Sequence, residues 1–327
     1  MHVLILGAAG MIGRKLTERL LKEQRIGARE ISRLTLHDVV APQVPAKASF
    51  PISASASDVS LPGEAEKLVA SKPDMIFHLA AIVSGEAEAD LDKGYRINLD
   101  GTRFLLDAIK KIDGYKPRVV FTSSIAVFGA PFPDQIGDEF FNTPLTSYGT
   151  QKAMGELMLG DYSRRGILEG VGIRLPTICV RPGKPNKAAS GFFSNIIREP
   201  LSGQEAVLPV SEDVRHWHAS PRSAIGFLIH AATIEMAKLN NRVNLSMPGL
   251  SVTVGEQIAG LERVAGKGVP KRIRREPDQT IMRIVSGWPR NFDASRAKSL
   301  GFTTAEKTFD DIVKLHIDDE LGGKFVA

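Results

Sequence analysis

The sequence predicts an α/β fold built on a doubly wound parallel sheet, joined to a smaller mixed α/β lobe. Short apolar runs alternate with helical patterns through the first half of the 327-residue chain, as in parallel sheets covered by helices. The first apolar run leads directly into a glycine-spaced turn and an amphipathic helix. Beyond residue 182 this alternation gives way to mixed short segments. We therefore expect one domain over residues 1–182 and mainly a separate lobe over residues 183–327, with some later segments returning to the first domain.

Strands and crossover helices can be assigned in order along the chain. The strands are expected at residues 3–6, 34–37, 49–52, 75–79, 119–122 and 172–180. The helices between them are expected at residues 11–22, 62–71, 92–111 and 147–164. In the lobe we expect helices at residues 192–201 and 221–236, a strand at residues 242–246, and two later helices. Six strands with crossover helices suffice for a doubly wound sheet.

The composition is that of a globular protein with a sizeable core, since 43% of the residues are hydrophobic and 24% are charged. The basic residues behind the net charge of +5 are scattered, apart from a cluster at Lys271, Arg272, Arg274 and Arg275. We expect this cluster to be a solvated surface, because no nucleic-acid motif flanks it. No nucleic-acid partner is expected, and the mild basic excess suits an anionic substrate.

Cys179 is the only cysteine, so no disulfide can form within the chain, and its apolar neighbours predict a buried side chain. The N-terminus enters a strand without the features of a signal peptide. No apolar stretch approaches the roughly 20 residues that span a bilayer. These observations predict a soluble, cytoplasmic protein with no membrane partner.

Gly7, Gly10 and Gly13 lie between the first strand and the first helix. Glycines at these places allow a tight turn, let the backbone approach a pyrophosphate, and start the helix with its amide groups facing the phosphates. A purely structural turn could show the same spacing. The flanking elements and an acidic residue downstream favour a dinucleotide-binding domain of the Rossmann type.

Asp38 is that acidic residue, at the end of the second strand. A carboxylate there can accept hydrogen bonds from both hydroxyls of the adenosine ribose, and it would repel the additional phosphate of NADP. Neither Val39 nor Val40 offers a cation to hold such a phosphate. The sequence thus predicts NAD as the cofactor, the alternative being that Asp38 is a solvated turn residue.

Tyr148 and Lys152 are four residues apart, so on a helix they lie on one face, one turn from each other. A phenol titrates near pH 10 when unperturbed, and a nearby ammonium group lowers its pKa toward neutrality, where it can exchange a proton with an alcohol. The preceding strand ends in hydroxyl groups, the last of them on Ser124. These three residues are the candidate catalytic unit.

Several further motifs accompany this unit. They are His78-Leu79-Ala80-Ala81, Asn98 with Gly101-Thr102, Ser124 before Val127-Phe128-Gly129, and two late segments at residues 293–297 and 300–302. With the glycine turn and the Tyr148–Lys152 pair, they resemble the extended short-chain dehydrogenase/reductase (NAD-dependent epimerase/dehydratase) family over nearly the whole chain. Phe128 stands where this family commonly has tyrosine, a change that removes a hydroxyl without touching the proton relay.

The resemblance implies a role for each matching residue. Tyr148 would be the general acid/base, Lys152 would lower its pKa and hold the nicotinamide ribose, and Ser124 would bind the substrate oxygen that becomes a carbonyl. Asp58 and Val59 would lie at the adenine. Asn98 would either lie at the cofactor or only fix its helix against the sheet. The expected cofactor-binding residues are Gly7, Gly10, Met11, Ile12, Gly13, Asp38, Asp58, Val59, Leu79, Ala80, Ala81, Asn98, Tyr148 and Lys152.

The family also includes dehydratases and epimerases of nucleotide sugars. Its dehydratases follow the active-site hydroxyl with an Asp-Glu pair, whereas this chain has Ile125 and Ala126, so elimination is disfavoured. Its epimerases usually hold the nucleotide with an asparagine after the sixth strand, where this chain has Arg181 and Pro182. A nucleotide-sugar 4-epimerase is disfavoured more weakly and stays an alternative.

Residues 191–201 and 215–222 resemble the D-erythronate dehydrogenases within this family. That resemblance implies NAD-dependent oxidation of the C2 hydroxyl of a small anionic sugar acid, D-erythronate, to 2-dehydro-D-erythronate. Its carboxylate needs cations or several donors, for which the lobe offers Arg181, Lys184, Arg215, His216 and Arg222. The expected substrate contacts are Ser84, Ser124, Tyr148, Arg181, His216 and Arg222. His216 and His218 share one face of a strand, but without a third ligand no metal site is expected.

A protein that senses the cofactor without catalysis is an alternative of another class, and the intact Ser124, Tyr148 and Lys152 argue against it. In the family, the helices expected at residues 92–111 and 147–164 pair across a two-fold axis, which implies a homodimer. The apolar positions of the first helix, Phe104, Leu105, Ala108 and Ile109, are equally explained by packing on the sheet.

Overall fold

The computed structural model describes residues 1–183 and 189–327. The described residues form two compact units. Unit 1 comprises Met1–Val127, Thr146–Arg174 and Ile225–Leu245, and unit 2 comprises Phe128–Leu145, Leu175–Ala224 and Ser246–Ala327. Lys184, one of the cations considered for the substrate carboxylate, lies outside the described residues.

Within the described residues, unit 1 is built on a seven-stranded sheet in the order β12-β8-β7-β6-β1-β4-β5. The strands are β1 (His2–Leu6), β4 (Arg33–Asp38), β5 (Ile52–Ala56), β6 (Met75–His78), β7 (Arg118–Ser124), β8 (Glu169–Leu175) and β12 (Asn244–Ser246). The pairings β6–β7, β1–β6, β1–β4 and β4–β5 are all parallel. Every residue of β1 and β6 is buried, as expected for a sheet covered on both faces. The predicted Rossmann-type fold is confirmed.

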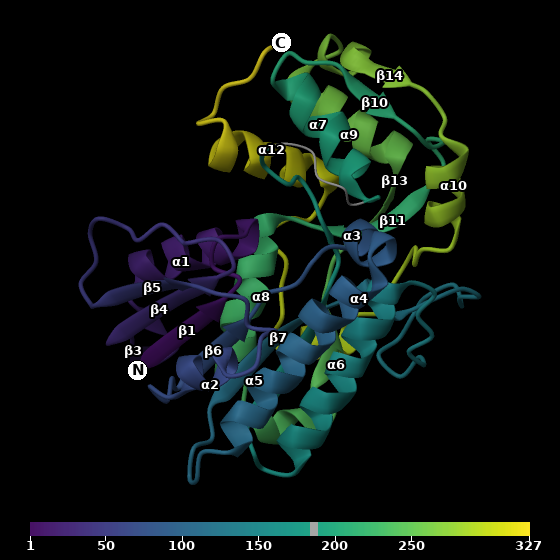
Figure 1. Ribbon diagram of the computed structural model, residues 1–327. Coiled ribbons are helices and arrows are strands. Elements are labelled where there is room, and N and C mark those ends of the chain that lie inside the picture. Colours follow the sequence, from purple (N-terminus) through teal and green to yellow (C-terminus); the bar gives the residue numbers. More distant parts are fainter. Residues whose placement is uncertain (184–188) are drawn as a thin grey trace. The chain divides into compact units, whose positions relative to one another are not determined.

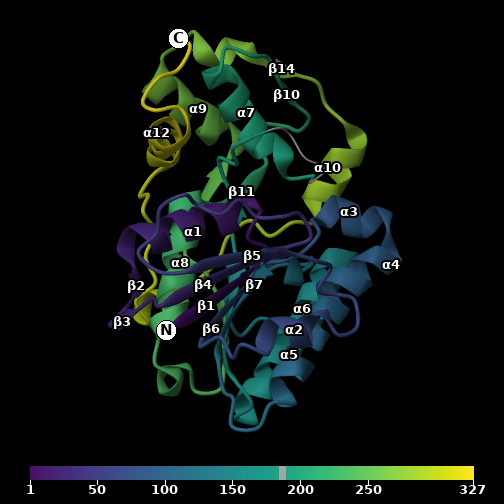
Figure 2. The ribbon, with the colours of Figure 1, turned by 60° about the vertical axis from the view of Figure 1, so that its left-hand side comes forward.

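Helices cover both faces of this sheet (Figures 1 and 2). One face carries α1 (Met11–Glu23) and α8 (Pro221–Thr233), and the other carries α2 (Glu64–Val69), α5 (Gly101–Lys110) and α6 (Ser147–Arg164). The smaller elements of unit 1 are β2 (Arg25–Ile26), β3 (Arg29–Glu30), α3 (Ser84–Ala89), α4 (Leu91–Gly94), the π-helix η1 (Tyr95–Asp100), and the 3-10 helices η2 (Ile125–Val127) and η3 (Met236–Leu239). Both faces of the sheet are therefore covered by helices of the chain itself.

Several predicted bounds were wrong, and proline explains two of them. The strand predicted at residues 49–52 begins at Ile52, directly after Pro51, and the long strand predicted at residues 172–180 is divided at Pro176 into β8 and β9 (Thr177–Ile178). Proline has no N–H to donate to a strand ladder. The helix predicted at residues 92–111 is divided by η1, and the strand predicted in the lobe is β12, which joins the main sheet beside β8.

In the described part of unit 2, β13 (Leu250–Thr253), β11 (Arg215–Ala219) and β9 form a three-stranded sheet, and β10 (Ala206–Leu208) pairs with β14 (Ile273–Arg275). The helices of unit 2 are α7 (Gly191–Leu201), α9 (Val254–Ala265), the 3-10 helix η4 (Val269–Arg272), α10 (Gln279–Ser286), α11 (Ser295–Ser299) and α12 (Phe309–Glu320). This combination is the mixed α/β lobe that the sequence predicts.

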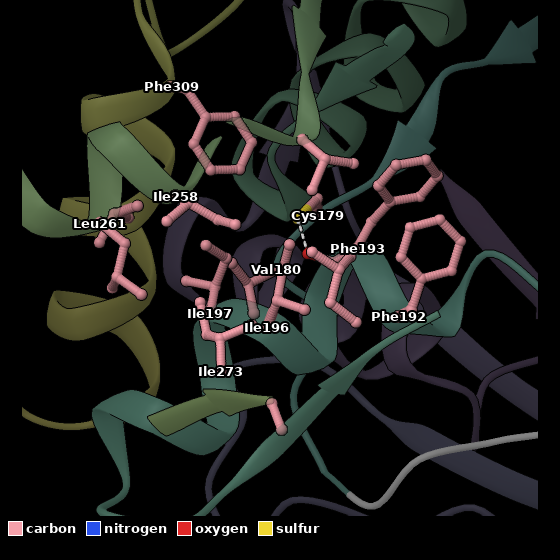
Figure 3. Packing of buried hydrophobic residues seen from close by; sticks show 14 of the residues in the cluster. Cys179, Val180, Phe192, Phe193, Ile196, Ile197, Ile258, Leu261, Ile273 and Phe309 are labelled. Atoms are coloured by element: carbon pink, nitrogen blue, oxygen red, sulfur yellow. Dashed lines mark hydrogen bonds between the residues drawn. The ribbon is translucent and has the colours of Figure 1, made fainter. Parts of the chain in front are cut away.

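The core of unit 2 gathers around α7, as Figure 3 shows. Phe193, Ile196 and Ile197 are fully buried against α9 and α12 residues that include Leu261 and Phe309. Cys179 is fully buried there too, and its thiol donates a hydrogen bond to the carbonyl of Phe193 at 3.3 Å. Burial raises the pKa of this thiol to about 12, so the predicted inert, buried cysteine is confirmed.

The basic cluster after η4 is a solvated surface, as predicted. Arg274 pairs with Glu205 and Glu276, and Arg275 pairs with Glu212, all through side chains that are more than two-fifths exposed. Over the described residues, no helix is both long and apolar enough to cross a membrane. Arg274 and Arg275 are thus matched by local acids, while Arg272 donates to the backbone carbonyls of Pro200, Val326 and Ala327.

Candidate active site

At two glycines of the turn after β1, the surrounding backbone leaves no room for a side chain. Gly7 has a φ of +90°, and a Cβ on it would lie 2.7 Å from the Ala80 nitrogen. A Cβ on Gly13 would lie 2.2 Å from the Gly7 carbonyl oxygen. The amides of Gly7 and Ala8 both donate to the carbonyl of His37, at 2.8 and 3.0 Å, which holds the turn against β4. Glycine is therefore required at Gly7 by both backbone conformation and space, and at Gly13 by space.

The first turn of α1 has the features of an anion-binding site. Its N-cap, Gly10, provides no side-chain hydrogen bond, and no acidic residue lies in the first turn. The amide groups there are free to point at phosphate oxygens, and the helix dipole favours the negative charge. The Asp38 carboxylate lies beside the turn, because its Oδ2 accepts from the Ala9 amide at 2.9 Å. A pyrophosphate and an adjoining ribose are the groups that fit this arrangement.

Asp58 was expected at the adenine and is held firmly in place. Its Oδ1 accepts from the Ser60 amide at 3.0 Å, and its Oδ2 pairs with Arg96 Nη1 at 2.5 Å. The adjoining Val59 is 6% exposed. The placement of these two residues at an adenine stays a prediction, and their contacts provide a fixed wall on this part of unit 1.

Asn98 is 1% exposed and lies inside η1. Its Oδ1 accepts from the Ile82 amide at 2.9 Å, and its Nδ2 donates to Gln151 Oε1 at 2.8 Å. Of the two readings of this residue, these contacts favour the one in which its amide fixes the helix, since both ends of the amide are used within the protein.

Tyr148 and Lys152 are positioned by the start of α6. The Thr146 side chain caps the helix by accepting from the Gly149 amide at 3.1 Å, so Tyr148 lies in the first turn and Lys152 one turn later. Gly155 lets the helix approach β7, since a Cβ there would lie 2.9 Å from the Phe121 ring. The predicted pair is thus on one helix face, against the strand that ends in Ser124.

Lys152 is 2% exposed, and its Nζ donates to the Thr122 carbonyl at 2.8 Å. The same Nζ lies 5.7 Å from the centre of the Tyr148 ring and 4.8 Å from that of Phe121. Burial lowers the pKa of Lys152 to about 8, while the charge of Glu156 acts to raise it. The ammonium form therefore persists at neutral pH, close to the tyrosine.

His78 lies under the same site and is uncharged. Its Nε2 is 2.9 Å from Thr102 Oγ1, and burial, with a smaller effect of the Lys152 charge, lowers its pKa to about 3. At neutral pH the described neighbours of Lys152 therefore include a neutral imidazole and the Glu156 carboxylate.

Ser124 ends β7 and is half-buried. Its Oγ accepts a hydrogen bond from the Ala126 amide at 3.2 Å. The hydroxyl hydrogen can then be donated to a ligand oxygen. A phenol, a buried ammonium and a hydroxyl donor are thus gathered on β7 and α6, the set of groups that can take a proton from an alcohol and hold its oxygen.

The other residues predicted to contact the substrate differ in burial and in their hydrogen bonds. Ser84 is half-buried at the start of α3. His216 is 2% exposed, its Nε2 is 2.7 Å from Thr177 Oγ1, and its Nδ1 is 2.8 Å from the Pro289 carbonyl. Burial lowers the pKa of His216 to about 4. This histidine is neutral at pH 7, with both ring nitrogens already engaged inside unit 2.

The three described arginines considered for the carboxylate also differ. Arg222 forms two hydrogen bonds to the Asp319 carboxylate, at 2.5 and 3.3 Å, on the surface. Arg215 lies 3.3 Å from the Glu256 carboxylate. Arg181 is half-buried, and its guanidinium donates to the Ile178 carbonyl at 3.1 Å and to the Ser190 hydroxyl at 3.2 Å.

A buried ion pair next to Lys152 on α6 was not predicted from the sequence. Glu156 and Arg174 are 1% and 6% exposed, and Arg174 Nη2 lies 2.8 Å from Glu156 Oε2. The signal for Glu156 was its position four residues after Lys152. Nothing in the local sequence pointed to Arg174 as its partner.

With this geometry in view, comparison with known proteins is informative. The NAD dependent epimerase/dehydratase family matches residues 3–220, well over half of the chain. This chain belongs to that family. Among curated members, a D-erythronate dehydrogenase of Cupriavidus necator is 44% identical over 98% of both chains, and one of Haemophilus influenzae is 40% identical over 98% of this chain and all of its own.

Solved structures of family members have the same fold. One described as a nucleoside-diphosphate-sugar epimerase from Agrobacterium tumefaciens is 66% identical, with a TM-score of 0.96 over 99% of this chain and 95% of its own. An L-threonine 3-dehydrogenase from Trypanosoma brucei is 25% identical, with a TM-score of 0.85 over 99% of each chain. As a member of the NAD dependent epimerase/dehydratase family, this chain is an NAD-dependent oxidoreductase, and the predicted cofactor is confirmed.

Proposed function

We propose that this enzyme oxidises the C2 hydroxyl of D-erythronate to give 2-dehydro-D-erythronate. The observation that carries the proposal is the buried Lys152 ammonium between the Thr122 carbonyl and the Tyr148 ring, on the helix that packs against the strand ending in Ser124. The choice of substrate is supported by full-length similarity to proteins described as D-erythronate dehydrogenases.

The cofactor would be held by the features already described. The α1 N-terminus and the glycine turn would bind the pyrophosphate, Asp38 the adenosine ribose, and Lys152 the nicotinamide ribose. NAD supplies the acceptor for the hydrogen and electron pair that leave C2. Tight packing around Gly7 and Gly13 supports this assignment, because the backbone must come close to the phosphates.

The chain's own groups act on the proton. Tyr148, as the phenolate, accepts the proton of the C2 hydroxyl, and Ser124 donates a hydrogen bond to the same oxygen as it becomes a carbonyl. Lys152 remains protonated and stabilises the phenolate. The reaction balances, since C2 loses one hydrogen with two electrons and the hydroxyl loses one proton.

We assign the substrate carboxylate to Arg181. Its bonds to Ile178 and Ser190 orient the guanidinium, and partial burial strengthens its attraction for an anion relative to the exposed Arg222. Ser84, His216 and Arg222 remain lesser candidates for substrate contacts. The neutral, fully engaged ring of His216 supports a role in holding unit 2 together.

The first experiment measures NADH absorbance with D-erythronate and a panel of other four-carbon sugar acids. We expect turnover with D-erythronate, and a loss of at least about a hundredfold in kcat in Tyr148→Phe, with NAD binding unchanged. Tyr162→Phe is the matched control, because Tyr162 lies on the same helix and its hydroxyl donates to Asp107. A Tyr148→Phe enzyme that keeps its rate would refute the assignment.

The carboxylate assignment has its own test. Arg181→Met should raise the KM for D-erythronate by about ten- to a hundredfold, since a charge-assisted hydrogen bond contributes about 1.5–3 kcal/mol. Arg222→Met is the control and should leave the KM within about twofold. The opposite pattern would move the carboxylate to Arg222.

A nucleotide-sugar 4-epimerase is the second candidate, because the solved relative from Agrobacterium tumefaciens is described as a sugar epimerase. An epimerase would interconvert nucleotide sugars with no net NADH. Incubation with UDP-glucose and UDP-galactose, followed by chromatography, separates the two proposals.

We further propose a homodimer formed through α6 and its neighbouring helix. Leu157 and Met154 lie on α6 and are 71% and 38% exposed, whereas Leu105, Ala108 and Ile109 of α5 are buried within the chain. Only the first two therefore need a partner to cover them. Sedimentation should give a dimer for the wild type and a monomer for Leu157→Lys, and a wild-type monomer would contradict the proposal.

A further inference from the structure

A buried network of charges and hydrogen bonds lies one helical turn beyond Lys152, and the proposed reaction does not use it. Its centre is Glu156, which follows Lys152 by four residues on α6 and is 1% exposed. Burying a carboxylate costs several kcal/mol unless it is paired and hydrogen-bonded, so a residue of this kind has to be matched closely.

Glu156 is matched by groups from separate strands. Arg174 on β8 donates to both of its carboxylate oxygens, at 2.9 and 2.8 Å, and Ser123 on β7 donates to Oε1 at 2.6 Å. The Asn244 side chain on β12 donates to the backbone carbonyl of Glu156 at 3.2 Å. Three strands of the sheet are thus tied to one point of α6.

This point joins the two elements that carry the proposed catalytic residues. Ser123 adjoins Ser124 on β7, and Glu156 shares a helix face with Tyr148 and Lys152, since the three are spaced by four residues. Phe121 and Ser123 alternate to the same side of β7 and meet Gly155 and Glu156 of α6. Any change at Glu156 therefore acts on the packing of α6 against β7, the two elements that carry Tyr148 and Ser124.

Glu156 also provides the negative charge that faces Lys152. The charged and titratable groups described around Lys152 are Glu156 and Tyr148 on α6 and His78 on β6, and His78 is neutral at pH 7. Burial acts against the ammonium form, and Glu156 acts for it. Arg174 holds the Glu156 carboxylate in place by two hydrogen bonds.

We propose that Glu156, held by Arg174 and Ser123, is a positioning residue that keeps Lys152 protonated and thereby lets Tyr148 act as a base near neutral pH. The inference rests on the proposed role of Tyr148 as the base. It adds a row of charged and titratable side chains in the order Arg174, Glu156, Lys152 and Tyr148. Glu156 itself touches neither substrate nor cofactor.

The test is a titration of Tyr148 that needs no substrate. Tyrosinate absorbance is followed with pH, and the signal of Tyr148 is obtained by subtracting the same protein carrying Tyr148→Phe. Burial raises the pKa of Tyr162 to about 12 and that of Tyr115 further, so these two do not overlap with a tyrosine that titrates near neutrality.

In Glu156→Gln we expect the Tyr148 midpoint to rise by about one pH unit or more, because Lys152 loses its charge at a lower pH. The acidic limb of kcat/KM should move with it, which lowers activity at pH 7 about tenfold for each unit. Glu156→Asp keeps the charge and should restore the midpoint even where thermal stability falls.

Breaking a buried pair can prevent folding, so Glu156→Gln combined with Arg174→Met is the second variant. Neutral replacement of both partners is better tolerated than loss of one. This double variant should still show a rise, smaller than that of Glu156→Gln because the positive charge of Arg174 is removed too. A midpoint that stays at the wild-type value, or falls as it would if Glu156 only repelled the phenolate, overturns the inference. Failure of the wild type to oxidise any sugar acid would count against the proposed function alone, because the titration does not depend on turnover.

Discussion

Lys152→Met tests how much free energy of folding the buried Lys152 ammonium costs. The folded environment lowers the pKa of Lys152 from 10.5 to about 8, a change of about 2.5 units. At about 1.4 kcal/mol per unit, holding this ammonium buried costs the folded state about 3 kcal/mol. Methionine fills similar space without charge, while the Thr122 carbonyl loses its donor at a cost of about 1 kcal/mol. We expect the apo variant to be about 2 kcal/mol more stable at pH 7, with turnover lost.

The pH dependence of the stability difference shows whether the Lys152 charge is its cause. The folded pKa lies below the unfolded one, so between about pH 8 and 10.5 the unfolded chain binds more protons and rising pH favours the folded state. The wild type should therefore approach Lys152→Met in stability as the pH rises through this window, and the variant's advantage should shrink.

Urea unfolding of the apo enzyme at pH 7 and pH 10 measures both effects. Lys67→Met, at a lysine that is 71% exposed and pairs with Glu64, is the control and should change stability by less than about 0.5 kcal/mol. The reasoning fails if Lys152→Met is less stable than the wild type at pH 7, or if its advantage is the same at both pH values.

Three other substitutions probe separate features. Asp38→Ala should lower the preference for NAD over NADP, as a ratio of kcat/KM values, by at least about tenfold, since it removes both the ribose acceptor and the repulsion of a 2′-phosphate. Gly13→Ala should abolish NAD binding or lower the melting temperature, because its Cβ would lie 2.2 Å from the Gly7 oxygen. Glu306→Gln should destabilise unit 2 by about 2–3 kcal/mol, because Glu306 is 1% exposed and accepts from the Ser220 amide at 2.9 Å and from two serine hydroxyls.

Steady-state kinetics with both cofactors, NAD titration by fluorescence, and thermal unfolding check these outcomes in turn. Unchanged NAD preference in Asp38→Ala would leave this residue as a structural cap of the glycine turn. Wild-type NAD affinity together with wild-type melting in Gly13→Ala would contradict the packing argument. Glu306→Gln with unchanged melting would mean that the buried serines are satisfied without the carboxylate.

The features that could be predicted from the sequence lie within one element or one turn. The glycines of the first turn, Asp38 at a strand end, and the four-residue spacing of Tyr148 and Lys152 all express local geometry, so their grouping could be predicted before any fold was known. Burial of Cys179 followed from its apolar neighbours for the same reason.

The misplaced elements depend on pairing between distant segments. The strand at residues 244–246 was assigned to the lobe, yet it joins β8 through contacts such as the Gly172 amide to the Val243 carbonyl at 2.9 Å. Segment Ile225–Leu245 accordingly belongs to unit 1. Periodicity identifies a strand but carries no record of its neighbour.

The sequence by itself determined the glycine turn, the choice of NAD, and the placing of Tyr148 and Lys152 on one helix face, because each is set by residues along one stretch of chain. Only the tertiary structure decided which charges are already matched. Arg222 forms an ion pair with Asp319, and Glu156 forms one with Arg174. The two ring nitrogens of His216 are hydrogen-bonded to Thr177 and to the Pro289 carbonyl. Whether a charged side chain is already paired depends on partners that folding brings from far along the chain, and burial strengthens the pairing of Glu156 with Arg174.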